Sequence, residues 1–154
     1  TEVWAGFESR DGFRFLARDR GWSHRRPNAL AWDIDVGRLA DAIRRRFRPE
    51  ETEIGQEAFD QRFVTRTNDP NKLRSLLDGS VMPRLLARSQ LAEIYIEGPD
   101  PEENASPQLA SLVLWDREFL ADVEALLDLH EVLLALLDRL SRSGSAVPVP
   151  TVSA

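Results

Sequence analysis

Two acidic side chains one residue apart are the strongest candidates for catalysis in this sequence. Asp33 and Asp35 follow the apolar stretch 28–32, which predicts a short strand. Carboxylates at the end of a strand can act as a nucleophile and a general acid beside a magnesium ion. Either side chain can also cap the helix predicted over 36–48. Capping explains the pair with fewer assumptions.

The same pair resembles the first motif of haloacid-dehalogenase-type phosphotransferases, in which the first Asp is the nucleophile and the second is the general acid. The resemblance implies a small magnesium-dependent phosphohydrolase that uses Asp33 and Asp35. That family also requires a downstream Ser or Thr, a Lys and a further acidic pair. Lys72 is the only Lys, and no later acidic pair ends a predicted strand. The phosphohydrolase therefore stands as the enzymatic alternative.

Composition excludes several classes of site. The chain has no Cys and two His, His24 and His130, so it lacks disulfides, a thiol nucleophile and thiolate zinc sites. We expect no cofactor and no metal. The 154 residues, 42% of them hydrophobic, suit one domain. No apolar run approaches the ~20 residues of a membrane span, so we expect a cytoplasmic protein. This expectation is compatible with a membrane anchor outside this sequence.

Charge is distributed unevenly along the chain. Residues 10–48 hold 11 Arg and 5 Asp, a net of +6, and the remaining residues have a net charge of −12. A basic segment of this kind can form an anion-binding module, here through Arg25, Arg26 and 44–46. Because the whole chain has a net charge of −6, we favour solvation or attraction within the fold, and we expect no nucleic-acid partner.

Hydrophobic periodicity predicts an α+β fold. We expect helices over 6–22, 36–48, 70–77, 81–89 and 116–142, and strands over 28–32, 59–67, 91–97 and 109–115. The last two strands should be antiparallel neighbours because no helix separates them. The prediction is a single domain, 1–142, with a small, mostly antiparallel sheet of three to five short strands. Residues 143–154 are expected to be a disordered tail or linker.

The stretch 58–70, AFDQRFVTRTNDP, followed by Leu pairs at 76–77 and 85–86, resembles a group of bacterial domains without an agreed activity. In that group an FDxxFxVxxxDP-like segment precedes two Leu-rich turns. The resemblance covers about residues 54–98. It implies an α+β domain with a structural or sensing role, which can lie near a membrane, and it implies no catalytic residue.

The long C-terminal helix is the main candidate for an interaction surface. Its apolar residues recur in alternating steps of four and three, a heptad pattern, and further Leu residues widen the apolar surface. We therefore predict a non-enzymatic interaction or regulatory domain whose partner is a protein or a second copy of itself, a homo-oligomer. The expected interface consists of Phe119, Val123, Leu126, His130, Leu133, Leu137 and Leu140.

Overall fold

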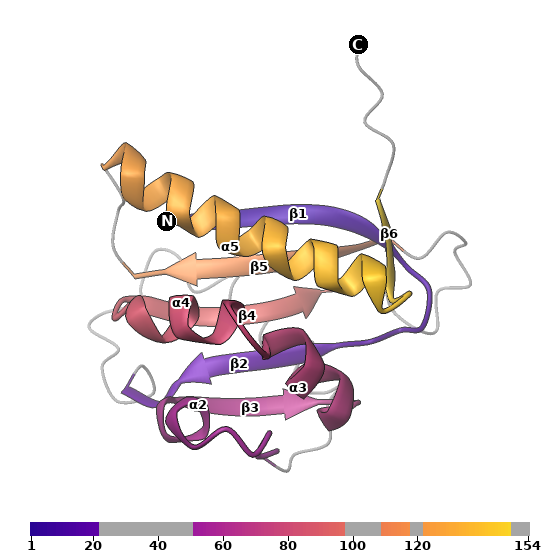
Figure 1. Cartoon of the computed structure of the whole chain (residues 1–154), viewed down its shortest axis with the longest axis horizontal. Helices are drawn as coiled ribbons and strands as arrows, with labels where there is room; N and C mark the ends of the chain where they lie inside the picture. Colours follow the sequence, from indigo (N-terminus) through magenta and orange to yellow (C-terminus); the bar gives the residue numbers. More distant parts are fainter. Residues whose placement is uncertain (22–50, 98–108, 118–121, 149–154) are drawn as a thin grey trace, which may run out of the picture.

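The computed structural model describes residues 1–21, 51–97, 109–117 and 122–148 (Figure 1). Within these residues the chain is α+β. In order, the elements are β1 (Glu2–Ser9), β2 (Phe15–Asp19), α2 (Glu57–Arg62), β3 (Phe63–Thr67), α3 (Pro70–Leu77), α4 (Val81–Ala87), β4 (Leu91–Glu97), β5 (Leu109–Asp116), α5 (Val123–Arg142) and β6 (Ala146–Pro148).

A curled six-stranded sheet organises the domain. The strand order is β3-β2-β4-β5-β1-β6, and each neighbouring pair is antiparallel. The predicted neighbours β4 and β5 do pair, with Ile94 opposite Leu114. The sheet has more strands than the three to five expected, because the first 21 residues supply two strands and the chain after α5 supplies another.

The helices α2, α3, α4 and α5 cover one face of this sheet (Figure 1). The main core lies between them, and its fully buried side chains include Phe15, Phe59, Leu73, Ile94 and Leu114. A second, smaller cluster of Leu16, Tyr95 and Val113 lies apart from the main core. Along β2, β4 and β5, residues alternate between these clusters because successive side chains point to opposite faces.

The prediction of a helix over 6–22 is wrong. These residues form β1, a turn and β2, and the turn includes Gly12 with a φ of +64°. A backbone at positive φ interrupts a right-handed helix. Of the residues expected on the apolar side of that helix, Phe7, Phe13 and Ala17 do lie in the main core, whereas Leu16 lies in the second cluster. They come from two strands, β1 and β2, and the turn between them.

One other element differs from the sequence prediction, and one start signal is confirmed. The strand expected over 59–67 begins with helix α2, and only Phe63–Thr67 is a strand. The helix that was to start after Asp69 does start there: the Asp69 side chain accepts a hydrogen bond from the amide of Lys72, and Pro70 is the first helical residue.

The C-terminal helix is amphipathic rather than apolar, which corrects the prediction. It begins at Val123, and residue 116 belongs to β5. One side of the helix is buried, and acidic residues lie on the side away from the core: Glu124, Asp128, Glu131 and Asp138. Beyond the helix, Ala146–Pro148 pair with β1, so the chain stays within the fold past residue 142. None of the helices in the described ranges is both long and apolar enough to cross a bilayer.

Candidate functional site

The structure divides the residues predicted from the sequence into three groups. Asp33, Asp35, Phe119 and the Arg-rich stretch 25–48 lie outside the described residues. Leu133 and Leu140 are each 1% exposed and pack in the core of their own domain, so they cannot face a partner. The exposed remainder of the expected interface is Val123, Leu126 and His130, with Leu137 half-buried.

The side of α5 that faces the sheet follows ordinary helical spacing. Its buried residues are Leu129, Val132, Leu133, Leu136 and Leu140. The heptad seam read from the sequence shares only two of these positions. A straight helix advances about 100° per residue, so a helix that packs on a sheet buries a broad side rather than a coiled-coil seam.

One flank of α5, which we call the closed flank, is joined to α3 and α4 by arginines. Arg84 Nη2 donates to Asp128 at 2.7 Å and to Glu131 at 2.9 Å. Arg88 Nη1 donates to Asp128 at 2.6 Å, and Arg139 Nη1 donates to the Leu76 carbonyl at 3.1 Å. The hydrogen bond from Arg84 lowers the pKa of Asp128 despite partial burial, so the carboxylate stays charged.

Arg88 also connects the closed flank to the end of β5. Its side chain is 11% exposed, and its Nη2 lies 3.5 Å from the carboxylate of Asp116, which is 2% exposed. Nearby, Arg62 donates to the carbonyls of Leu85 and Leu86 from α4 and pairs with Asp19 at the end of β2. These cations hold α4 and α5 in position over the sheet.

The opposite flank of α5, the open flank, carries no charged residue. It consists of Val123, Leu126, Leu127, His130, Leu134, Leu137 and Ser141. Val123 is 67% exposed, Leu127 is 56% exposed and Leu134 is 50% exposed. Because α3 and α4 contact the closed flank, the open flank lies on the other side of the helix, toward β1 at the margin of the sheet (Figure 1).

Part of the outer edge of β1 has no neighbour among the strands that the structure describes. β6 pairs with Phe7, Glu8 and Ser9 only. Across the rest of the strand, residues 2–6, no strand of the described ranges pairs on that side. Trp4, in the middle of this segment, is 64% exposed. An apolar helix flank and an open strand edge therefore lie at the same margin of the molecule.

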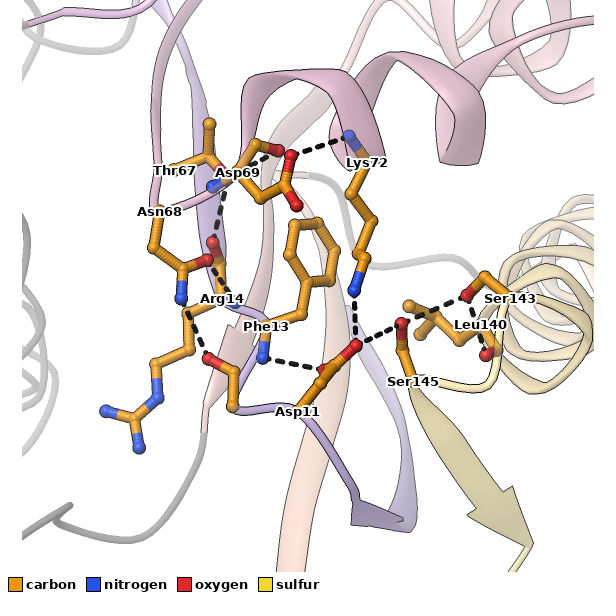
Figure 2. Close-up of polar contacts among 11 residues, drawn as sticks. Asp11, Phe13, Arg14, Thr67, Asn68, Asp69, Lys72, Leu140, Ser143 and Ser145 are labelled. Carbon is orange, nitrogen blue, oxygen red and sulfur yellow. Dashed lines mark hydrogen bonds and ion pairs between the residues drawn. The ribbon is translucent and has the colours of Figure 1, made fainter.

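A polar cluster joins the β1–β2 turn to α3 and to the end of α5 (Figure 2). The Asp11 carboxylate accepts hydrogen bonds from the Lys72 ammonium group and from the Ser145 hydroxyl, the latter at 2.8 Å. The Phe13 amide donates to the other carboxylate oxygen at 3.0 Å, and the Ser143 hydroxyl lies 3.0 Å from that of Ser145.

A hydroxyl, a carboxylate and an ammonium group together could suggest a serine nucleophile, but the geometry opposes it. Ser145 is 1% exposed, so a substrate cannot reach its hydroxyl. Partial burial by itself would raise the pKa of Asp11, but the hydrogen bonds from Lys72, Phe13 and Ser145 outweigh it and lower that pKa. A carboxylate with a lowered pKa is a weak base. The cluster instead fastens β6 and the end of α5 to the β1–β2 turn.

A hollow beside α2 contains a carboxylate that is committed to structure. This shallow hollow is lined by Arg20, Glu53, Gly55, Glu57, Asp60 and Gln61. Asp60 accepts the backbone amides of Ile54, Gly55 and Gln56 at 2.9–3.0 Å, which stabilises the start of α2. Across the described ranges, no group of three or more His, Asp or Glu side chains is placed to hold a metal ion.

Sequence reasoning found the open flank only in part. It recognised surplus leucines on the last helix, including Leu127 and Leu134, and assigned the interface to the heptad seam. It missed the open edge of β1 because it predicted no element over residues 2–5 and assigned residue 6 to a helix. It also missed the arginine contacts of the closed flank. Their partners are separated by 37 to 63 residues in sequence, and no local pattern indicates such pairs.

Comparison of the chain with protein-family models, curated proteins and solved structures finds no match in any of the three.

Proposed function

We propose that this chain is a non-enzymatic interaction domain that associates with a second copy of itself through the open flank of α5. The observation that carries the proposal is the uncharged, apolar surface on one flank of a helix whose other flank is fixed by ion pairs. Val123, Leu127 and Leu134 are all at least half exposed there.

Apolar side chains on this scale favour association. Removing one Leu side chain from water contributes about 2 kcal/mol. Several such side chains are needed to exceed the loss of rigid-body freedom when two proteins bind. The open flank offers Leu126, Leu127 and Leu134 within three helical turns, beside the half-buried Leu137. An isologous interface requires a patch that matches itself, and an uncharged stripe meets a second copy of itself without like-charge repulsion.

Absolute mass in solution tests the proposal. We expect light scattering behind a sizing column to give twice the 17.5 kDa chain mass at high protein concentration. The double substitution Leu127→Glu with Leu134→Glu should return the mass to that of one chain. Both side chains are half exposed or more, so the fold should survive, which circular dichroism checks.

The control keeps the change of charge and moves it away from the open flank. Arg142→Glu lowers the net charge by two, as the double leucine variant does, at a side chain that is 79% exposed. We expect this variant to keep the wild-type mass. A wild-type chain that stays at the single-chain mass up to high concentration refutes self-association.

A further inference from the structure

We propose that two copies join along β1: residues 2–6 of one chain pair antiparallel with residues 2–6 of the other across a two-fold axis. The open flanks of α5 then meet above this joint. The inference rests on the proposed self-association and specifies its geometry. The result is one sheet that continues through both copies, with all helices on the same face.

The hydrogen bonds between β1 and β5 show which backbone groups point outward. Thr1 and Asp116 exchange both bonds, since the Thr1 nitrogen donates to the Asp116 carbonyl at 2.9 Å and the Asp116 amide donates back at 2.8 Å. In an antiparallel pair the bonded residues alternate, so odd residues of β1 bond to β5 and even residues face out. The Arg10 amide, which donates to Ser145 in front of β6, follows this rule.

The outward groups of Glu2, Trp4 and Gly6 therefore form a short, open edge. β6 begins its pairing at Phe7, and none of the strands that the structure describes pairs with residues 2–6 on that side. Exposed edges are commonly protected by Lys, Pro or a bulge, yet the sequence EVWAG contains neither residue, and the register with β5 is regular. The opposite edge of the sheet is different, because there the Thr52 amide donates a hydrogen bond to the Thr65 carbonyl of β3.

A two-fold axis beside Trp4 uses every outward group once. Trp4 pairs with the partner's Trp4, and Glu2 pairs with the partner's Gly6, each pair exchanging both backbone hydrogen bonds. Because Pro148 already lies opposite Phe7, the partner's Thr1 turns out of the strand in the dimer. This register places each carboxylate opposite a glycine instead of another carboxylate. It also brings the two indole rings together on the face away from the helices, where Trp4 is now 64% exposed.

The same register brings the two α5 helices to packing distance. α5 contacts both β1 and β5, and strands are about 4.8 Å apart. A helix above these two strands lies about 5 Å from an axis at the outer edge of β1, so two related helices lie about 10 Å apart. Packed helices are separated by 8–10 Å. The surfaces that face each other are the open flanks, because the closed flanks turn toward α3 and α4.

Cysteine substitution tests the register directly, because the chain has no other Cys. Residues opposite each other in a bonded pair have Cα atoms about 5.5 Å apart, which suits a disulfide. We expect Trp4→Cys to give a covalent dimer under mild oxidation with oxidised glutathione. Glu2→Cys is the matched control on the same face: its two copies would be about 14 Å apart, too far to join.

A proline substitution separates this inference from the broader proposal. Trp4→Pro removes an outward amide and leaves the bonds to β5 intact, so it should weaken the dimer at least tenfold, whereas Trp4→Ala keeps the amide and should stay dimeric. Equal cross-linking of the two Cys variants, or an unweakened Trp4→Pro dimer, overturns the β1 joint. If Leu127→Glu with Leu134→Glu still gives monomers in that case, self-association through α5 stands. A monomeric wild type refutes both.

Discussion

The two flanks of α5 belong to one helix but differ in their contacts: one forms ion pairs within the chain, and the other exposes apolar side chains. On the closed flank, Asp128 and Glu131 receive hydrogen bonds from Arg84, and Arg139 binds the end of α3. The seven residues of the open flank carry no charge, and several of its leucines are exposed. Directional, charge-assisted bonds fix where the helix lies. The exposed leucines of the open flank make no such bonds, and we therefore propose that a partner covers them.

The largest expected effect comes from breaking the closed flank. Arg88→Ala removes a side chain that is 11% exposed and its contacts with Asp116, Asp128 and the Ala125 carbonyl. Loss of one partner of a buried ion pair costs about 3–5 kcal/mol. Chemical denaturation should show this loss. Arg88→Lys keeps the charge without the planar guanidinium, so its stability should lie between those of the wild type and Arg88→Ala. Equal stability of all three proteins would contradict the role assigned to Arg88.

Two adjacent leucines sharpen the comparison between the sheet side and the open flank. Leu133 is 1% exposed and Leu134 is 50% exposed. Leu133→Ala leaves a cavity in the core and should cost about 3 kcal/mol. Leu134→Ala should change the stability of the monomer by less than about 0.5 kcal/mol. Thermal or denaturant unfolding below the concentration of association measures both, and similar values would mean that α5 is rotated from the position described.

An effect smaller than those of Arg88→Ala and Leu133→Ala is a pH-dependent one on the closed flank. The pKa of Asp128 is lowered by the hydrogen bond from Arg84, so its charge favours the folded state. Asp128→Asn should lower the free energy of unfolding by up to about 1 kcal/mol at neutral pH, as the loss of other solvent-accessible ion pairs does. The contribution is present above the ordinary carboxyl value of 3.8 and is lost as the pH falls through the lower pKa of the folded state.

The control for this pH dependence is Asp138→Asn. Asp138 pairs with Arg142 at 2.9 Å, but the two side chains are 53% and 79% exposed, so its loss should matter less. Unfolding midpoints measured from pH 3 to pH 7 give the comparison. A difference between Asp128→Asn and wild type that persists unchanged at pH 3 would contradict the assignment.

Local signals predicted the elements that depend on a few neighbouring residues. Asp69 followed by Pro70 predicted the start of α3, and β4 and β5 were predicted as neighbours because no helix separates them. Periodicity failed where two short strands were spaced like one helix, over β1 and β2. The positive φ of Gly12 in the intervening turn separates them, and a single glycine in a sequence does not reveal its φ.

The sequence by itself determines that this chain has a surplus of apolar residues on its last helix, because composition and spacing are local properties. Only the tertiary structure decides that Leu133 serves the core while Leu127 and Leu134 face out. It also decides that β6 stops at Phe7, so that residues 2–6 of β1 have no neighbour on that side among the described strands. Burial and edge pairing depend on what lies across the fold from each residue, and neighbours of that kind are tens of residues away along the chain.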